Sequence, residues 1–483
     1  MQIISFPNEE VGKGDYLTVE DFKTGKSLIV QVVDIQYANI PGIFEELLRN
    51  YNGDSSLQGE DIDPFEVATH VAYIQDARLL VCKIRATNIN GDMVFTSSWL
   101  PSRSRAVIRK LPIERLFASA KNGNGYMIDL GETNEKKQFQ VDVRALDGGL
   151  NIITGKKGTG KSHVSKLLTL SLVTHGAPVV VLDINGEYTG LGRTADGKPN
   201  DLHEKIHILT PKQNFKLNLG EFKIRVMLNI LVNALHLPGT SAREFGRIWR
   251  FLDQNNALNM RELGEAIKNW KCNQHVRDAL FSRYYTLLNS GLFTDEPSKV
   301  ASFEDSIHKA RVGGAIVINL RDTSTVDRHV LVEYVLGKLV DLLTAKKLRA
   351  IFLFAEEAHL YLRETYWDDI VTRMRHYGMF TTFVTNQPET IRENIYRQAD
   401  NLFLFNFTND HDLETVSRAS KVDADTVKSV ARDLPPHHCL VLGKIVNDFP
   451  IVTKVRKLDV QTMGHTRLFF SEIHPLSNHL ASM

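Results

Sequence analysis

A glycine-rich loop that ends in Lys161 and Ser162 is the first stretch whose residue types could do chemistry. Residues 155–162 read Gly-Lys-Lys-Gly-Thr-Gly-Lys-Ser, which fits the pattern G-x-x-x-x-G-K-[ST]. The glycines let successive backbone N–H groups converge on phosphate oxygens, and the helix that follows adds its positive end. Lys161 can reach the β- and γ-phosphates, and the Ser162 hydroxyl can ligate Mg²⁺. The loop therefore predicts a site for a nucleoside triphosphate.

Acidic residues follow two apolar runs of strand length: Asp183 and Glu187 after the first run, Glu356 and Glu357 after the second. In a triphosphatase the first carboxylate of such a pair holds Mg²⁺, usually through water, and the second orients or deprotonates the attacking water. Two adjacent buried carboxylates repel each other and need a cation. On the residues alone, both pairs could be loop caps. The phosphate loop favours the catalytic interpretation, with Glu356 at the metal and Glu357 as the base.

Two further residues could complete a hydrolytic site. Gln387 comes directly after a predicted strand and could contact the γ-phosphate, although a turn before Pro388 is the alternative. Arg375 could stabilise transition-state charge, often from a neighbouring subunit, or it could lie on a solvated helix face. The run His437-His438-Cys439 lacks a second ligand cluster with zinc spacing, so no metal site is expected there.

The predicted site has three groups of residues. Catalysis is assigned to Lys161, Glu357, Arg375 and Gln387, and Mg²⁺ to Ser162 and Glu356. The residues expected to contact the nucleotide are Gly155, Lys157, Gly158, Thr159, Gly160, Lys161, Ser162, His163, Asp183 and Glu187.

The elements that must position these residues alternate between apolar strands and helices. Such alternation predicts a mainly parallel sheet with helices on both faces. The predicted strands of this α/β core are residues 150–153, 178–183, 206–209, 315–320, 350–355, 380–385 and 402–405, with short later strands at 439–442 and 450–455. Helices are expected at 329–343 and 368–377, and about four more between 220 and 295, where apolar residues recur at helical spacing.

The domain boundaries follow from these changes of pattern. Residues 1–118 predict a small β domain, a barrel or a sandwich, with strands at 15–19, 27–33, 68–74, 79–85 and 93–97. Within it, the basic stretch 103–109 is interpreted as a solvated face or linker, with a binding patch as the alternative. The ATPase core is assigned to 119–219 and 300–455, a helical insertion to 220–299, and a C-terminal tail to 456–483.

Composition limits the class of protein. The 483 residues include 58 Lys and Arg against 57 Asp and Glu, which argues against a surface coated with basic charge but allows a local basic lining such as a channel. Three widely spaced cysteines fit a reducing cytoplasm. No apolar run approaches the roughly 18 residues that a membrane helix needs, and the N-terminus does not resemble a signal peptide.

This set of motifs resembles the HerA-type ATPases of the HerA–FtsK branch of RecA-like P-loop motors. Residues 183–188 are similar to the family's D-x-x-G-E-Y, and residues 356–359 to its [DE]-E-A-H box. Residues 375–379 resemble its R-K-x-G segment, which carries the proposed arginine finger, and residues 385–388 its Q-R-P sensor. The departures are Glu356 where many P-loop enzymes have Asp, no Arg between Gln387 and Pro388, Met374 where Gly is common, and Asn406 near the place where relatives often carry Arg.

The resemblance implies an α/β, RecA-like ATPase core with a small N-terminal β-barrel domain and a helical insertion. It also implies a homohexameric ring that hydrolyses ATP with Mg²⁺ at subunit interfaces and moves double-stranded DNA through its pore. The implied partner is a NurA-type nuclease in DNA end resection, or another effector, docked on the N-terminal domain, with the C-terminal tail bracing the next subunit. Two alternatives remain open: an ATPase scaffold of an antiviral defence complex, and a secretion-type motor.

Overall fold

The computed structural model describes residues 1–38, 76–89, 92–95, 99–117, 125–296, 302–361, 371–407, 409–420 and 422–463. The chain forms two compact units. The first unit consists of Met1–Leu146, Ile152–Lys161 and Asn386–Arg456. The second unit consists of Asp147–Asn151, Ser162–Thr385 and Lys457–Met483.

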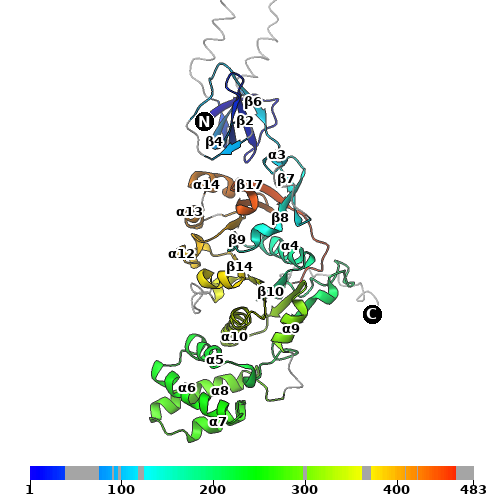
Figure 1. The fold of residues 1–483 in the computed structure, drawn as a ribbon. Helices are drawn as coiled ribbons and strands as arrows, with labels where there is room; N and C mark the ends of the chain where they lie inside the picture. Colours follow the sequence, from blue (N-terminus) through cyan, green and yellow to red (C-terminus); the bar gives the residue numbers. More distant parts are fainter. Residues whose placement is uncertain are drawn as a thin grey trace, which may run out of the picture. The chain divides into compact units, whose positions relative to one another are not determined.

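A parallel sheet forms the centre of the second unit (Figure 1). Its strand order is β11-β12-β10-β13-β14, and each neighbouring pair is parallel. The strands are β10 (Pro178–Asp183), β11 (Ile206–Leu209), β12 (Gly314–Asn319), β13 (Ile351–Ala355) and β14 (Met379–Thr385). All five lie where the sequence predicts strands, because continuous apolar runs are typical of strands buried on both faces.

The helices of the second unit divide into those around its sheet and those of a separate bundle. Around the sheet are α4 (Lys161–Thr174), α9 (Phe303–Ala310) and α10 (Thr325–Thr344). The bundle contains α5 (Ile224–Asn229), continued by a π-turn at Ile230–Ala234, then α6 (Gly239–Gln254), α7 (Met260–Asn269) and α8 (Gln274–Asn289). Figure 1 shows these helices in green, and α5 packs against α10. The predicted helices between 220 and 295 are therefore confirmed.

The first unit contains the strands that flank the phosphate loop. In the order β9-β15-β16-β17-β7-β8, these are β9 (Asn151–Thr154), β15 (Asn401–Leu404), β16 (His438–Gly443), β17 (Ile451–Val455), β7 (Met127–Thr133) and β8 (Gln138–Asp142). From β15 onward each neighbouring pair is antiparallel. The short helices of this unit are α3 (Ile113–Leu116), α12 (Glu393–Tyr396), α13 (Asp410–Ala419) and α14 (Ala424–Arg432).

An antiparallel sheet also begins the first unit. Its order is β1-β4-β3-β2-β6 with β5 on β4, and the strands are β1 (Gln2–Ser5), β2 (Tyr16–Asp21), β3 (Lys26–Tyr37), β4 (Arg78–Ile89), β5 (Asp92–Val94) and β6 (Ala106–Lys110). Within the described ranges β1 and β6 are its edge strands, so the predicted closed barrel is not confirmed. The strand predicted at 68–74 lies outside the described residues.

Two local features of the first unit refine or add to the sequence predictions. The basic stretch 103–109 is not a linker, because most of it enters the edge strand β6, where Arg109 pairs with Glu20 of β2 at 3.2 Å. The solvated-face interpretation fits, since Arg109 is exposed. Residues Asp410–Ala419 and Ala424–Arg432 form the helices α13 and α14, neither of which is predicted from the sequence.

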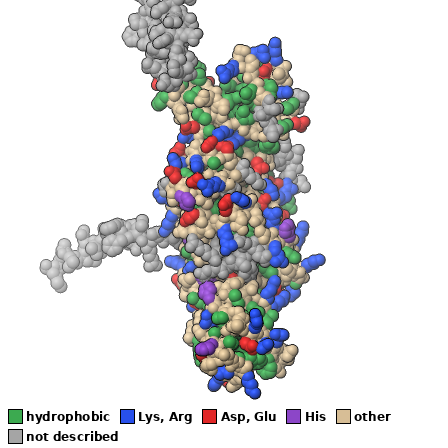
Figure 2. All heavy atoms as spheres, turned by 90° about the vertical axis from the view of Figure 1, so that its left-hand side faces the viewer, with side chains coloured by type: hydrophobic (Ala, Val, Ile, Leu, Met, Phe, Trp, Pro, Cys, Tyr) green, Lys and Arg blue, Asp and Glu red, His purple; other side chains and the backbone are tan. Residues whose placement is uncertain are grey.

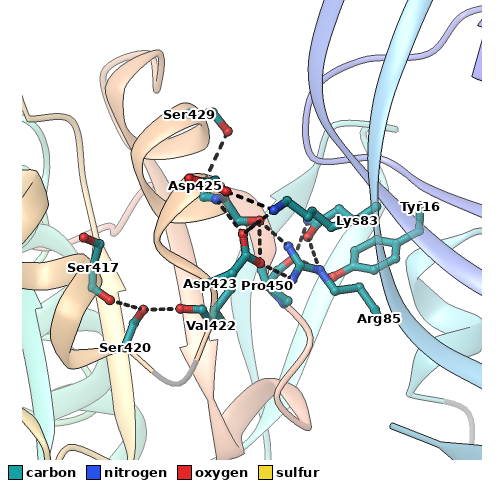
Figure 3. A network of polar contacts seen from close by, with 12 residues as sticks. Tyr16, Lys83, Arg85, Ser417, Ser420, Val422, Asp423, Asp425, Ser429 and Pro450 are labelled. Atoms are coloured by element: carbon teal, nitrogen blue, oxygen red, sulfur yellow. Dashed lines mark hydrogen bonds and ion pairs between the residues drawn. The ribbon is translucent and has the colours of Figure 1, made fainter. Parts of the chain in front are cut away.

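The N-terminal sheet docks on α14 through a network of charged and polar groups (Figure 3). The Arg85 guanidinium on β4 donates to Asp423 at 2.8 Å and to Thr426 at 2.7 Å. Asp423 also caps α14 by accepting from the Thr426 backbone N–H. Burial opposes ionisation of the Asp423 carboxyl, but the hydrogen bonds from Arg85 and Thr426 outweigh it and lower its pKa to about 2. The N-terminal sheet and α14 are therefore joined by an ion pair, and its hydrogen bonds fix the orientation of the Arg85 side chain.

Candidate nucleotide site

The phosphate loop is anchored to the first unit by main-chain hydrogen bonds at both of its ends. At its start, Phe405 N donates to Thr154 O and Lys156 N donates to Asn406 O, each at 2.9 Å. At its far end, His437 N donates to Thr159 O at 2.9 Å. The loop thus rests on the segments that follow β15 and precede β16. Asn406 has a structural role here, because its side-chain amide donates to the carbonyls that end α14.

Lys161 is held inside the loop that precedes it. Its side chain is buried, and its ammonium donates to Lys156 O at 2.9 Å. The Thr159 hydroxyl donates to the same carbonyl at 2.7 Å. The positive charge of the Lys161 ammonium can attract a phosphate anion. The predicted placement of Lys161 at the start of α4 is confirmed. Ser162 and His163 follow in the first turn of this helix, both half-buried.

The acidic residues of the second unit meet at the carboxyl edge of its sheet. Strands β10 and β13 pair with Leu182 opposite Ala355, so the next residues, Asp183 and Glu356, emerge side by side. Asp183 accepts hydrogen bonds from Glu187 N at 3.0 Å and Tyr188 N at 2.8 Å. Burial raises the pKa of Asp183 to about 6 despite these two N–H donors. Asp183 thus accepts hydrogen bonds from the loop that follows it, as the loop-cap alternative expects. It also lies at the carboxyl edge of the sheet, beside Glu356.

Glu356 is the second buried carboxylate of this edge. It is 3% exposed, and its Oε1 accepts from the Tyr188 hydroxyl. Burial, partly opposed by that hydrogen bond, raises the pKa of Glu356 to about 8, and the charges of Glu187 and Asp183 add to the rise. The carboxylates at this edge of the sheet therefore need more positive charge nearby if they are to be ionised together.

Glu357 has a left-handed backbone, which is rare for a residue with a side chain. Its φ is 48° and its ψ is 45°, a conformation that stores strain and recurs at functional sites. Its carboxylate lies 3.3 Å from His359 Nδ1, and that nitrogen lies 3.2 Å from the Thr385 hydroxyl at the end of β14. The carboxylate of the predicted base is thus held by a neighbour that β14 positions.

A pocket of about 200 Å³ adjoins the phosphate loop within the first unit. It is lined by Lys156, Lys157, Asn386, Gln387, Phe407 and Asp412. The structure therefore brings the predicted Gln387 to the same pocket as the loop lysines. Burial raises the pKa of Asp412 to about 6, helped by a hydrogen bond with the Glu389 carboxyl. Arg375 lies on the short 3₁₀ turn Met374–Tyr377 of the second unit, and its catalytic role stays a prediction.

Sequence reasoning assigned no role to Ser165, Lys166 or Tyr188, which surround the acidic edge. Lys166 is 7% exposed, and its ammonium lies 3.5 Å from Glu187 and 5.6 Å from the centroid of the Tyr188 ring. The only signal for Tyr188 is its place at the end of D-x-x-G-E-Y.

The donor set of the second unit fits Mg²⁺. The Ser162 hydroxyl and the carboxylates of Asp183 and Glu356 are hard oxygen ligands, which Mg²⁺ prefers. Burial disfavours the ionised carboxylates, so a divalent cation there would relieve their repulsion. Among the described residues no three His, Cys, Asp or Glu side chains gather as a metal cage. Mg²⁺ does not need one, because it commonly takes one or two carboxylates together with substrate phosphates and water.

Replacing Glu356 by Gln should stabilise the ligand-free chain at alkaline pH. Between the ordinary pKa of 4.5 and the folded value of about 8, the folded chain holds a proton that the unfolded chain has released. Stability therefore falls by about 1 kcal/mol per pH unit across this window through Glu356 alone. We expect thermal unfolding in EDTA from pH 5 to 8.5 to show a shallower decline for Glu356→Gln. The control Glu304→Gln, an exposed residue whose pKa is lowered by Lys347, should keep the natural slope. Equal slopes for the natural and Glu356→Gln chains would contradict the prediction.

The fold and motifs have counterparts among known proteins. Residues 128–339 match the family model described as the central domain of the helicase HerA. The chain is 24% identical over 430 residues to the DNA double-strand break repair helicase HerA of Sulfolobus acidocaldarius, a match that covers 82% of this chain and 81% of the relative. The protein of the same name from Saccharolobus solfataricus is 23% identical over 354 residues, 68% of each chain.

Solved structures show the same fold at lower identity. VirB4 of Thermoanaerobacter pseudethanolicus superposes with a TM-score of 0.55 at 16% identity, over 70% of this chain and 98% of that chain. The bacterial conjugative coupling protein TrwB superposes with a TM-score of 0.52 at 15% identity, over 74% of this chain and 94% of that chain. TrwB in complex with the ATP analogue ADPNP superposes with a TM-score of 0.51 at 15% identity, over 73% of this chain and 94% of that chain. In the described residues no helix is long and apolar enough to cross a membrane. The matched central domain, the two relatives and the shared fold together show that this chain is similar to the HerA-type P-loop ATPases.

Proposed function

We propose that the chain is an ATP-dependent translocase of double-stranded DNA that works as a homohexameric ring in the cytoplasm. The observation that carries the proposal is the pair Glu356 and Glu357 at the end of a buried strand, in a chain with a complete phosphate loop. A chain that only bound nucleotide would not need a buried carboxylate followed by a strained acidic residue. The DNA substrate is supported by the two relatives, which are named as DNA double-strand break repair helicases.

Each site residue then has a distinct task in hydrolysis. Lys161 neutralises the β- and γ-phosphates, and Ser162 with Glu356 would hold Mg²⁺, which supplies charge stabilisation for the leaving group. Glu357 accepts the proton of the attacking water, and Gln387 contacts the γ-phosphate from the pocket that it shares with Lys157. Arg375 acts on the site of the neighbouring subunit. The remaining loop residues contribute backbone N–H groups.

The surface supports a restricted DNA contact and a protein partner. On the face shown in Figure 2, Lys and Arg side chains of the described residues are interspersed with Asp and Glu, which suits a local basic lining in a pore. The N-terminal sheet domain exposes large apolar side chains, among them Phe22, Phe95 and Leu100, each at least 60% exposed. Apolar side chains that form one exposed patch mark a docking surface, and we propose that these do so. We assign it to a NurA-like nuclease or a similar effector in DNA repair.

The test measures ATP hydrolysis and native mass of the purified chain. We expect linear double-stranded DNA to raise the hydrolysis rate several-fold, and Lys161→Ala to abolish both basal and stimulated hydrolysis, because Lys161 supplies the charge at the phosphates. Native mass spectrometry with ATP and DNA should show six copies. Hydrolysis that no DNA stimulates, by a chain that stays monomeric, would overturn the translocase and favour a secretion-type motor. Six copies without DNA stimulation would favour the defence scaffold.

A further inference from the structure

The Tyr188 hydroxyl lies between two residues from different elements of the second unit. Its oxygen is 2.6 Å from Ser165 Oγ on α4 and also contacts Glu356 Oε1 at the end of β13. Tyr188 and Ser165 are both fully buried, and Glu356 is 3% exposed. Water therefore does not compete for these hydrogen bonds.

The directions of these hydrogen bonds follow from the number of protons. When a cation holds Glu356 in its ionised form, the carboxylate can only accept, so the single proton of the Tyr188 hydroxyl is donated to Glu356. The tyrosine oxygen then accepts a hydrogen bond from the Ser165 hydroxyl. The result is a relay of two hydroxyl groups that runs from Ser165 through Tyr188 to Glu356. Since α4 begins at Lys161, the relay connects the helix of the phosphate loop to the strand that carries the acidic pair.

Two further contacts hold Tyr188 in place. Its backbone N–H donates to Asp183 Oδ2 at 2.8 Å, which sets its position at the edge of the sheet. The Lys166 ammonium lies over the ring at 5.6 Å from the centroid and is itself paired with Glu187 at 3.5 Å. A ring held in this way cannot rotate its hydroxyl away from Glu356 without breaking several contacts.

We propose that Tyr188, supported by Ser165, is a positioning residue that fixes the Glu356 carboxylate and thereby sets the affinity of the nucleotide site for its divalent cation. The inference rests on the proposed function, in which Glu356 helps to hold Mg²⁺. With Oε1 occupied by the tyrosine hydroxyl, the second carboxylate oxygen remains available to the cation or its water shell. Outer partners of this kind typically change metal affinity or activity by about 10- to 100-fold.

The experiment measures cation affinity directly and apart from turnover. Mn²⁺ is titrated into the full chain with saturating ADP and followed by electron paramagnetic resonance. We expect Tyr188→Phe, which keeps the ring and its contact with Lys166, to weaken Mn²⁺ binding about 10-fold or more. ADP affinity in EDTA should be unchanged. In hydrolysis assays the Mg²⁺ concentration for half-maximal rate should rise by the same factor, with a smaller change in kcat.

A second variant separates positioning from a general loss of stability. Ser165→Ala should weaken Mn²⁺ binding less than Tyr188→Phe does, and the double variant should be no weaker than Tyr188→Phe, because Ser165 acts only through Tyr188. Tyr16→Phe is the matched control: it removes another buried tyrosine hydroxyl, one that donates to Pro450 O at 2.9 Å, and should leave Mn²⁺ binding unchanged. Thermal unfolding of each variant reports on folding.

The outcomes distinguish this inference from the proposed function. If the natural chain binds Mn²⁺ with ADP and Tyr188→Phe binds it equally well, the relay is overturned while the proposed function stands. Losses that add up in the double variant would also overturn the relay, because independent effects on stability add. A natural chain that binds no Mn²⁺ with ADP would overturn both.

Discussion

The Glu357→Gln chain is expected to bind ATP as tightly as the natural chain and to hydrolyse it about 100- to 10,000-fold more slowly. The amide keeps the shape of the side chain but cannot take a proton from water. It leaves Lys161 and its contact with Lys156 O unchanged, so phosphate binding should persist. Single-turnover hydrolysis and the equilibrium binding of a fluorescent ATP analogue measure the two quantities separately.

An exposed glutamate provides the control for Glu357→Gln. Glu393 is paired with Arg397 one helical turn away and is largely exposed, so Glu393→Gln removes a carboxylate without touching the acidic edge. Its hydrolysis rate should match that of the natural chain, because exposed pairs of this kind contribute little. A Glu357→Gln chain that hydrolyses ATP within about twofold of the natural rate would show that another group accepts the proton.

The strands that carry the acidic residues could be predicted because their signal is local. Residues 178–182 and 351–355 are continuous apolar runs, and a strand buried on both faces needs such a run. Their parallel order also brings the carboxyl ends to one edge, so Asp183 and Glu356 meet as their motifs imply. The phosphate loop is equally local, since its glycine spacing and the helix behind it lie within one stretch of chain.

Contacts between segments that are far apart in the sequence could not be predicted from local residue patterns. Strand β7 pairs not only with its neighbour β8 but also with β17, more than 300 residues later, and nothing in its own residues indicates that second partner. The same holds for Tyr188: its partner Glu356 is 168 positions away, and a lone aromatic residue after Gly-Glu gives no sign of that contact. The left-handed backbone of Glu357 was equally hidden, because glutamate has no preference for that region.

Replacing Gly155 by Ala tests how closely the phosphate loop must approach its support. A Cβ atom at this position would lie 2.5 Å from Phe405 Cβ and 3.1 Å from Phe405 Cα, so backbone would have to move. The φ of Gly155 is also +149°, which side chains rarely allow. We expect unfolding free energy to fall by about 3 kcal/mol from overpacking and backbone strain combined.

The functional loss should exceed the loss of stability in Gly155→Ala. Phe405 N holds Thr154 O and Asn406 O holds Lys156 N, so a shift of Gly155 displaces the hydrogen bonds on both sides of it. A displacement of about 1 Å in groups that cradle a ligand can cost 100-fold, and we expect ATP binding to weaken by at least about that factor. Gly197→Ala separates the two effects. Gly197 has a φ of +85° and nothing within 4 Å of its Cβ position, so its variant should lose about 1 kcal/mol and bind ATP normally. Normal ATP binding by Gly155→Ala would mean that the loop can be supported without its close approach to Phe405.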